Sequence, residues 1–559
     1  MGNKFTADFE TTTQENDCRV WAYGLCEIGN PDNFICGNSI EEFMALCGNL
    51  NGYTLYFHNL KFDGEFILNW LFRNDFKWVD DKRKLEDYSF STLISDSGLF
   101  YCMNISFRKS KIKILDSLKV LPFSVEKIAK DFNLPIHKLE LDYNEIREIG
   151  HKLTEKEISY LRNDVEIMAR AMKIMLDLGQ VKMTTGSNAL AEYKSITGKK
   201  KFEKIFPPPE YDADVRKCYK GGFTYLNPIF AGRILNDGIV LDVNSLYPSV
   251  MYFNKMPYGE PIRFEGKYPG DKLYNLYVQV LKCQFIIKKD HIPSIQIKNN
   301  RSYVETEYLT ESKGEVVLCL TSVDLDLMFQ QYDVYNIEWL GGYAFKSTDT
   351  LFRTYIDKWN KIKIQATIDH NGSMRAIAKL MLNSLYGKFA TNPIVQSKQP
   401  YLENGIVKYR LMPKEERKPI YIPTGAFITS WARYKTITSA QKVYSRFIYA
   451  DTDSLHLLGT EMPEGLEIDS TKLGAWKHES TFSKAKFIRQ KSYIEVIDSE
   501  IKITCAGMPK DCYPYVTIDN FEPGMSYPGK LKPTHVPGGI VLKDIDFTIR
   551  RCYNVSEGK

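Results

Sequence analysis

Short apolar segments alternate with amphipathic segments along the first 190 residues. Four apolar segments are predicted to be strands, at residues 5–10, 54–57, 92–94 and 112–115. A long helix is predicted after Thr154, because Thr154 and Glu157 have the spacing of a capping box. Apolar residues then recur at helical intervals from Ile158 to Met172. Strands mixed with helices predict an α/β domain over residues 1–190.

The pattern changes after this unit. Three lysines at 199–201 and three prolines at 207–209 predict a linker, because proline cannot continue a helix or a central strand. Two later stretches, residues 255–350 and 394–421, are predicted to be insertions. The second contains Asn404-Gly405 between two β-rich runs, which predicts a hairpin with a type I′ turn.

The composition is that of an ordinary globular protein. With 559 residues, 43% of them hydrophobic and 26% charged, two to four domains are expected. The net charge of +5 is weak evidence for a nucleic-acid partner, but acidic metal sites inside basic grooves can sum to near neutral. The 11 cysteines show no zinc-type spacing, so we expect free thiols in a reducing compartment. No apolar run predicts a membrane span.

Candidate chemistry lies first in a set of acids in the N-terminal unit. Asp8 and Glu10 are two apart on a predicted strand, so their carboxylates point to one face. Asp63 follows another strand, and Asp164 lies four residues after Tyr160 on the predicted helix. Four carboxylates could hold two divalent metals, and Tyr160 could orient an attacking water. Each acid alone is more often solvated surface, so the prediction depends on the set.

A second acidic set lies in the C-terminal part. Asp242 ends one apolar strand, and Asp451 and Asp453 lie in a turn after another. Strand end and turn could bring Asp242 and Asp451 together on two metals that activate a 3′-hydroxyl and bind a triphosphate.

Between these acids, a predicted helix at 374–390 carries polar residues at i, i+4, i+7 and i+8, on one face: Lys379, Asn383, Tyr386 and Gly387. The lysine could pair with phosphates, and the tyrosine could lie against a base. The alternative is an ordinary amphipathic helix with Leu380, Leu382 and Leu385 in the core.

Taken in order, these motifs resemble those of family B DNA polymerases, and of their protein-primed phage members in particular. Three exonuclease motifs are matched by Asp8-x-Glu10, Asn59-x-x-Phe62-Asp63 and Tyr160-x-x-x-Asp164. Three polymerase motifs are matched by the run from Asp242 to Pro248, by Lys379 to Gly387, and by Tyr449-x-Asp451-Thr-Asp453-Ser454. The resemblance covers essentially the whole chain, and it is strongest to polymerases of small Bacillus podoviruses with linear genomes.

The resemblance implies a mixed α/β fold with an RNase H-like 3′–5′ exonuclease domain before a right-hand polymerase. The implied divisions are an exonuclease domain at 1–190, a linker and start of the palm at 191–254, a first terminal-protein-region insertion at 255–350, fingers at 351–393, a second insertion with a β-hairpin arm at 394–421, palm at 422–513 and thumb at 514–559.

It also implies roles for individual residues. In the exonuclease, Lys138 would assist catalysis, and a frayed 3′ end would be held by Thr11, His58, Asn59, Phe62, Ser117, Leu118 and Tyr143. For Phe62 and Leu118, core packing is an equally weighted alternative. In the polymerase, Tyr247 would exclude ribose, Tyr386 would lie beside the nascent pair, and Lys363 and Lys379 would contact the triphosphate.

The resemblance also implies which polymerase residues bind metal and which contact DNA. Val243 would join Asp242 and Asp451 as a metal ligand, while Asp453 would orient its motif. DNA contacts are implied for Tyr219, Gly221, Gly222, Thr429, Arg433, Lys491 and Tyr493. Two departures weaken parts of this assignment: the loop 367–373 after Lys363 is longer than in the family, and the region between Tyr493 and Cys505 is shorter.

The resemblance further implies two Mg²⁺ ions per site, replaceable by Mn²⁺, with dNTP substrates. Expected partners are primer–template DNA, single-stranded 3′ ends and a terminal protein, for a monomer without membrane association in the cytoplasm of an infected bacterium.

Other functions fit less well. A reverse transcriptase or RNA polymerase usually has adjacent aspartates in the turn, and Tyr247 favours deoxyribose. A stand-alone exonuclease leaves residues 210–559 without a role. A non-catalytic single-strand binding protein would not need either acidic set.

Overall fold

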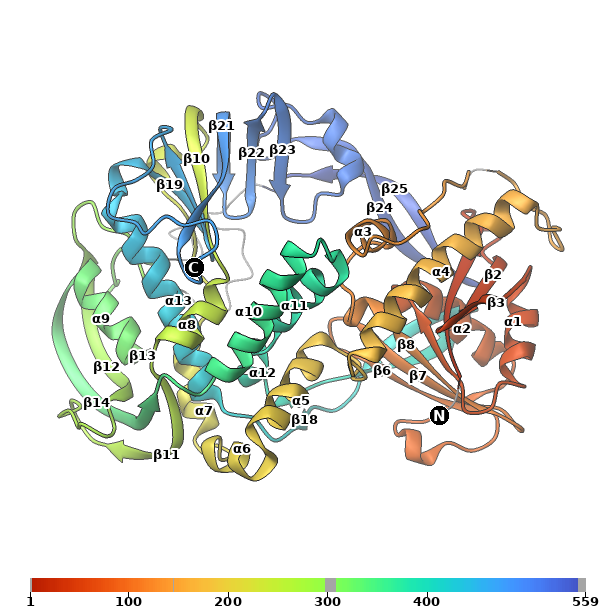
Figure 1. Ribbon diagram of the computed structural model, residues 1–559, viewed down its shortest axis with the longest axis horizontal. Helices are drawn as coiled ribbons and strands as arrows, with labels where there is room; N and C mark the ends of the chain where they lie inside the picture. The colour runs from red at the N-terminus through yellow and green to blue at the C-terminus, as the bar shows by residue number, and fades with distance from the viewer. Residues whose placement is uncertain (1–2, 144, 297–307, 551–559) are drawn as a thin grey trace.

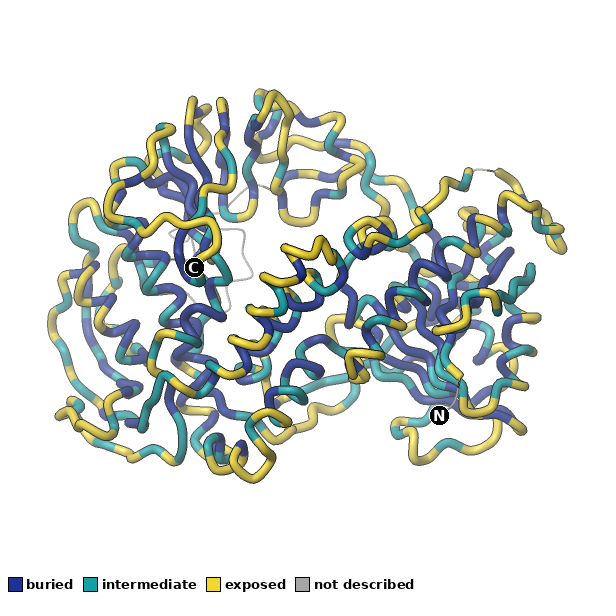
Figure 2. Tube along the Cα trace, viewed as in Figure 1, coloured by how far each residue is buried: buried dark blue, intermediate teal, exposed yellow. Residues whose placement is uncertain are grey.

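The computed structural model describes residues 3–143, 145–296 and 308–550. Two lobes lie side by side, an N-terminal lobe and a larger C-terminal lobe, with a pair of helices between them (Figure 1). Both lobes contain sheets and helices, which confirms the mixed α/β prediction. Each lobe has its own buried interior beneath an exposed outer layer (Figure 2). Among the described helices, none is long and apolar enough to cross a membrane.

The N-terminal domain is built on an eight-stranded sheet in the order β3-β2-β1-β4-β8-β7-β6-β5, with β1, β4 and β8 parallel at its centre. The predicted capping box at Thr154 and Glu157 is present at the start of α4, which packs across β1 and β2. All four predicted strands are found. The elements are β1 Lys4–Thr11, β2 Val20–Glu27, β3 Asn30–Gly37, α1 Ile40–Cys47, β4 Thr54–Phe57, α2 Leu60–Arg73, β5 Lys77–Trp78, β6 Ser89–Ile94, β7 Phe100–Ser106, β8 Lys111–Asp116, α3 Val125–Asp131 and α4 Glu155–Asp177.

Helices connect the two lobes where a linker was predicted. Residues 199–201 begin α6 (Lys199–Ile205), so the prediction of an irregular segment is wrong for the three lysines. Gly198, with φ of 84°, separates α6 from α5 (Thr185–Thr197), and buried Phe202 anchors α6 against Tyr193. Only the prolines at 207–209 are irregular, and α7 (Asp212–Val215) follows them. The predicted boundary at residue 190 falls inside α5.

The palm is a seven-stranded sheet in the order β23-β22-β21-β10-β20-β19-β9. The helix α13, most of which is buried, packs against this sheet and against α8. The palm elements are β9 Thr224–Leu226, β10 Ile234–Val243, α8 Leu246–Phe253, α13 Ile422–Lys442, β19 Phe447–Asp451, β20 Ser454–Leu458, β21 Trp476–Arg489, β22 Ser492–Ile497 and β23 Glu500–Cys505.

Insertion 1, residues 255–350, forms its own four-stranded sheet in the order β11-β14-β12-β13, covered by one helix. Its residues 297–307 lie outside the described residues. The elements are β11 Met256–Phe264, β12 Leu276–Ile287, β13 Val316–Thr321, α9 Ser322–Gln331 and β14 Tyr332–Thr348.

The helices between the lobes fall within residues 351–393, for which fingers were predicted. Helix α10 (Arg353–Ile368) packs against α11 (Gly372–Ser384), and residues 369–371 connect them. The single helix predicted at 374–390 is divided, because α11 ends at Ser384 and α12 (Tyr386–Phe389) follows. Leu382 and Leu385 are buried while Lys379, Asn383 and Gly387 are exposed. Tyr386 and Leu380 are half-buried, so the predicted polar face is confirmed only in part.

Two hairpins reach the N-terminal domain from the polymerase lobe. In the predicted hairpin, Asn404 and Gly405 have φ of 53° and 76°, as a type I′ turn requires. The C-terminal hairpin is the predicted thumb, which extends over the N-terminal lobe (Figure 1). Short strands flank the first hairpin. The elements are β15 Ile394–Val395, β16 Lys398–Glu403, β17 Ile406–Leu411, β18 Glu415–Glu416, β24 Ser526–Val536 and β25 Gly539–Thr548.

Both hairpins meet on one carboxylate of α2, a contact we call the Glu65 junction. Tyr409 of β17 donates a hydrogen bond to Glu65 Oε1 at 2.7 Å, and His535 Nε2 of β24 lies 3.1 Å from the same oxygen. Around them, Val407, Val536 and other hairpin residues share the buried core of the N-terminal domain. The arm, the thumb and the N-terminal domain are therefore packed as one unit.

Candidate active sites

The palm sheet brings Asp242 and Asp451 to either side of one residue. In the antiparallel registers, Asp242 of β10 pairs with Ser454 of β20, and Asp451 of β19 pairs with the same Ser454. The turn between β19 and β20 is tight: Thr452 has φ of 60°, and Val243 donates its backbone N–H to Asp453 O at 2.8 Å. The predicted pair of acids is therefore assembled by strand register.

The polymerase acids lie in an electrostatically strained environment. Desolvation, and then the charges of Asp242 and Asp451, raise the pKa of Asp453 to about 6, although this side chain keeps access to solvent. Burial also raises the pKa of Asp242, and the nearby Lys477 opposes that shift. Lys491 contacts both carboxylate oxygens of Asp451, at 2.9 and 2.8 Å. Such carboxylates are stabilised by a cation.

Thr224 also holds Asp451, by donating from Oγ1 to Oδ1 at 3.0 Å. Thr224 and Lys477 were not predicted from the sequence, because neither has a recognisable spacing from the acids. Lys477 Nζ lies 3.4 Å from Asp242 Oδ2 only because β21 pairs with β10.

A cluster of basic side chains faces the same acids. Burial, followed by repulsion from Lys379, Arg375 and Lys477, lowers the pKa of Lys363. Lys363 Nζ donates to Ser245 Oγ at 3.3 Å, so α10, α11 and β21 each contribute a cation beside α8. Arg375 was missed in the sequence, although it lies one helical turn before Lys379 on the exposed face. Crowded cations of this kind favour binding of a polyphosphate.

Three tyrosines form the other wall of the site. The rings of Tyr247 and Tyr386 are stacked with centroids 3.9 Å apart. Burial, and then the nearby Tyr386, raises the pKa of Tyr219. A Cβ on Gly222 would meet Thr452 Oγ1 at 2.7 Å and Tyr247 Oη at 3.1 Å. Gly222 therefore lets the 219–222 segment approach the acidic turn.

Two predicted DNA contacts point instead into the protein. Thr429 is buried in α13 and donates its hydroxyl to Ala426 O at 3.1 Å. Arg433 is also buried and donates to Lys220 O, Gly221 O and both oxygens of Asp324. These two side chains are therefore not placed to contact DNA directly, because their polar atoms are hydrogen-bonded inside the protein. Arg433 supports the 219–222 segment.

The predicted contacts near the palm edge lie beside the acids. Lys491 is exposed apart from its ion pair with Asp451. Tyr493 is half-buried, with its ring 5.0 Å from Phe487 and 5.1 Å from Tyr449. Burial raises the pKa of Tyr493 to about 12.

The N-terminal acids converge from three elements. Asp8 and Glu10 lie on β1, Asp63 on α2 and Asp164 on α4, and the last three are almost fully buried. Burial, and then repulsion from Asp8, Asp164 and Asp63, raises the pKa of Glu10. Burial and then Asp164 raise the pKa of Asp8 to about 7. The four predicted acids are therefore electrostatic neighbours.

Lys138 and two tyrosines complete this group. Lys138 Nζ donates to Asp164 Oδ2 at 2.6 Å, while the buried Oδ1 of Asp164 has no hydrogen-bond partner. The hydroxyls of Tyr160 and Tyr143 are 2.7 Å apart. Tyr143 is exposed and Tyr160 is buried, so their contact links solvent to the acids.

The predicted holders of a 3′ end differ in accessibility. His58 bonds Ser117 Oγ and Phe123 O, at 3.0 and 2.7 Å, and burial lowers its pKa. Ser117 is fully buried and donates to Phe57 O. Asn59 is exposed with φ of 78°, whereas Phe62 and Leu118 are half-buried. Thus Asn59, Phe62 and Leu118 offer surface to a ligand, and Ser117 orients His58.

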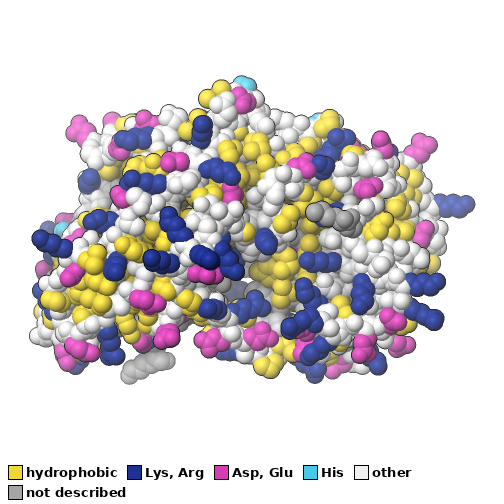
Figure 3. Space-filling view, turned by 60° about the horizontal axis from the view of Figure 1, so that its bottom comes forward, with side chains coloured by type: hydrophobic (Ala, Val, Ile, Leu, Met, Phe, Trp, Pro, Cys, Tyr) yellow, Lys and Arg dark blue, Asp and Glu magenta, His cyan; other side chains and the backbone are white. Residues whose placement is uncertain are grey.

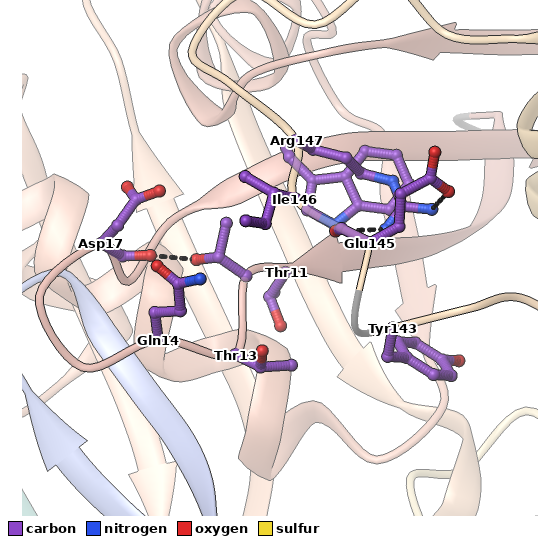
Figure 4. Close-up of a pocket in the computed structure, with 10 residues that line it drawn as sticks. Thr11, Thr13, Gln14, Asp17, Tyr143, Glu145, Ile146 and Arg147 are labelled. Atoms are coloured by element: carbon purple, nitrogen blue, oxygen red, sulfur yellow. Dashed lines mark hydrogen bonds and ion pairs between the residues drawn. The ribbon is translucent and has the colours of Figure 1, made fainter.

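A small cavity of about 30 Å³ brings two of these residues together (Figure 4). Thr11, at the end of β1, and the exposed Tyr143 both border it, with Gln14 and Ile146 nearby. None of the four N-terminal acids is among the residues that line it.

Both acidic sets suit divalent metals that a substrate helps to hold. In residues 3–143, 145–296 and 308–550, no group of three or more Asp, Glu, His or Cys side chains is placed to hold a metal ion by itself. Mg²⁺ is commonly held by one or two carboxylates, waters and substrate phosphates rather than by an all-protein cage. The unpartnered Asp164 Oδ1 and the mutually repelling acids fit this mode.

Comparison with known proteins agrees with this architecture. A model of the family "DNA polymerase type B, organellar and viral" matches residues 47–471, so the chain belongs to this family of DNA polymerases. Within it, the chain is similar to the DNA polymerase of Bacillus phage phi29, with 48% identity over 98% of this chain and 99% of that protein. The DNA polymerase of Streptococcus phage Cp-1 is 34% identical over 98% of each chain.

Solved structures show the same relation in three dimensions. The phi29 DNA polymerase complexed with primer-template DNA and incoming nucleotide substrates superposes with a TM-score of 0.93, at 47% identity, covering 98% of this chain and all of that one. Its complex with single-stranded DNA gives a TM-score of 0.92. The fold is therefore that of a family B DNA polymerase with exonuclease and polymerase domains.

Proposed function

We propose that this family B polymerase copies a linear phage genome, starting on a terminal-protein hydroxyl, displacing the non-template strand and proofreading with a 3′–5′ exonuclease. The observation that carries the polymerase assignment is the placement of Asp242 and Asp451 on either side of Ser454, facing Lys363, Lys379 and Arg375. Phosphoryl transfer needs this combination of metal-binding acids and cations for a triphosphate.

In the polymerase site, Asp242, Asp451 and the backbone of Val243 would hold two Mg²⁺ ions, for which Mn²⁺ can substitute. When bound, such ions activate the attacking oxygen and stabilise the leaving one. The lysines of α10 and α11 neutralise the triphosphate of a dNTP. Tyr247 and Tyr386 border the space beside the sugar and base. The ring of Tyr247 fills the position that the 2′-hydroxyl of a ribonucleotide would need.

In the exonuclease site, Asp8, Glu10, Asp63 and Asp164 would hold the same kind of ions. Tyr160 orients a water, and Lys138 beside Asp164 stabilises developing negative charge. Phe62, Asn59, Leu118, Thr11 and Tyr143 offer stacking surface and polar groups to a single-stranded 3′ end, as such ends require.

The accessory functions are proposed for the two insertions. Insertion 1 is a separate sheet attached to the palm, which suits a docking surface for a terminal protein. The hairpin of residues 394–421 and the thumb close onto the N-terminal domain at the Glu65 junction, which suits separation of template from displaced strand. We propose that the enzyme acts as a monomer in the cytoplasm of the infected bacterium.

A single labelled primer–template distinguishes the two sites. With magnesium and nucleotides, Asp451→Ala should lose extension by about a thousandfold or more, because a metal ligand is gone. It should still degrade single strands. Asp8→Ala combined with Asp63→Ala should show the reverse. Near-normal extension by the Asp451 variant would refute the polymerase assignment, and undiminished degradation by the double variant would refute the exonuclease.

Protein priming has its own test. The enzyme is incubated with its terminal protein, one labelled nucleotide and magnesium, and we expect a covalent protein–nucleotide product. Deleting part of insertion 1 should abolish that product while DNA primers are still extended. Failure to label terminal protein under conditions that extend DNA primers contradicts protein priming alone.

A further inference from the structure

Two cysteines meet where insertion 1 touches the polymerase body. Cys218 ends the 3₁₀ helix Arg216–Cys218 just before Tyr219, and Cys319 lies on β13 of insertion 1. β13 packs against this 3₁₀ helix, and Cys319 lies against the buried core that includes Cys218. Cys319 Sγ donates to Asp214 O at 3.9 Å, and Asp214 is four residues before Cys218. The two cysteines are 101 residues apart in sequence, but the elements that carry them pack together.

The surroundings hold these sulfurs in place from both sides. Asp214 Oδ2 accepts a hydrogen bond from Tyr343 of β14 at 3.2 Å, and Cys319 pairs with Val280 in the insertion sheet. Cys218 is only 1% exposed, whereas Cys319 is half-buried. An oxidant can therefore reach Cys319 first, with Cys218 positioned behind it as the second thiol.

The cysteine pair also flanks the buried ion pair between Asp324 and Arg433. Arg433 binds the carbonyls of Lys220 and Gly221, just after Cys218, at 2.8 and 2.7 Å. Asp324 lies in the first turn of α9, five residues after Cys319, and accepts from Arg433 Nη2 at 2.7 Å. A covalent link between the sulfurs would run parallel to this ion pair and fix the same two segments.

We propose that Cys218 and Cys319 are an oxidation site, at which a peroxide or a small-molecule disulfide produces a reversible disulfide that fastens insertion 1 to the 216–222 segment. With peroxide, the Cys319 thiol is oxidised to a sulfenic acid with release of one water. The Cys218 thiol then attacks that sulfur, the S–O bond breaks, and a second water leaves. With a small-molecule disulfide, Cys319 forms a mixed disulfide and Cys218 displaces the second thiol.

The Cys218–Cys319 disulfide should stabilise the polymerase site without taking part in catalysis. Segment 216–222 leads to Gly222, which lies under Thr452 and Tyr247. Neither cysteine contacts the acids, so extension of a DNA primer should continue after oxidation. A cross-link spanning about 100 residues constrains the unfolded chain strongly. We expect the half-life of polymerase activity during heating to lengthen by about threefold or more.

The folded full-length enzyme tests this with hydrogen peroxide or oxidised glutathione, followed by alkylation and peptide mapping. The expected product joins the peptides of Cys218 and Cys319 and disappears with dithiothreitol. Cys319→Ser should abolish both the linked peptide and the gain in heat resistance, and Cys218→Ala should do the same. Cys36→Ser, at another half-buried cysteine on β3, is the matched control and should keep both.

Two results would overturn the proposal. One is that Cys218 and Cys319 remain separately alkylated after an oxidant treatment that modifies Cys36 in the same sample. The other is that Cys319→Ser gains as much heat resistance on oxidation as the parent enzyme.

Discussion

In both active sites, individual carboxylates are paired with a lysine. Lys491 lies on Asp451, Lys477 on Asp242 and Lys138 on Asp164. Carboxylates held close together repel each other, and an ammonium group offsets part of that repulsion. Lys477 and Lys138 thus oppose the rise in pKa that burial causes in Asp242 and Asp164, a role that is independent of any contact with DNA.

Gly222 gives a sharp test at this scale. Gly222→Ala places a Cβ 2.7 Å from Thr452 Oγ1, in the turn between Asp451 and Asp453. Because displacement of catalytic groups by about 1 Å can cost on the order of a hundredfold, we expect extension to fall by tens-fold or more. Steady-state single-nucleotide insertion on a primer–template measures this.

The neighbouring glycine is the matched control. A Cβ on Gly221 would meet no atom within 4 Å. Gly221→Ala should therefore retain most of the parental insertion rate. Equal losses in the two variants would mean that the contact with Thr452 is unimportant.

At the scale of elements, deleting the hairpin β16–β17 tests its proposed role in synthesis through duplex DNA. Replacing residues 398–411 by a short flexible linker should leave single-nucleotide insertion intact, since the hairpin packs against α2 rather than against β10 and β19, which carry Asp242 and Asp451. Synthesis through duplex DNA should fall, because one of the two contacts at the Glu65 junction is lost. Product length on primed single-stranded and on gapped duplex templates separates these effects, and undiminished synthesis through duplex would contradict the assignment.

The thumb hairpin provides a pH-dependent contact. The hydrogen bond to Glu65 raises the pKa of His535, while burial and Lys61 oppose it. A raised pKa means that the pair stabilises the fold below the unfolded value of about 6.5 and loses that effect as pH rises through the folded pKa. His535 is partly exposed, so the contribution is at most about 1 kcal/mol.

We therefore expect the thumb to dissociate more readily from α2 as pH rises from about 6 to 8. Hydrogen exchange of β24 and β25 measures this directly. His535→Gln should remove the pH dependence, whereas Tyr409→Phe removes a neighbouring hydrogen bond and should keep it. A pH-dependent exchange that persists in His535→Gln would contradict the assignment.

Much of this arrangement could be predicted from sequence, but only where a signal is local. The capping box at Thr154 and the Asn404-Gly405 turn are encoded by neighbouring residues, and both were found as expected. The lysines at 199–201 were misassigned because buried Phe202 holds α6 in place, a tertiary effect. Thr429 and Arg433 match a motif, yet both are buried: Thr429 bonds the preceding turn of its own helix, and Arg433 bonds Lys220, Gly221 and Asp324, which are distant in sequence.

At the scale of the whole molecule, a hollow separates the two lobes, and Lys and Arg side chains gather around it (Figure 3). The net charge of +5 conceals this because acids elsewhere balance it. If DNA lies in the hollow, binding releases counterions from phosphates. Affinity for primer–template should therefore fall steeply and log-linearly with salt concentration in a titration by fluorescence anisotropy. A flat response would contradict a DNA-binding groove.

The Glu65 junction has a consequence for how such an enzyme can be divided. Val407, Val536, Ile540 and Val541 belong to the polymerase half in sequence, but their buried surface is supplied by the N-terminal domain. Cutting the chain near residue 190 would expose those apolar side chains to solvent and remove the surface on which both hairpins pack. The exonuclease and the polymerase are thus not interchangeable cassettes, and exchanging one between relatives requires exchanging the tips of both hairpins with it.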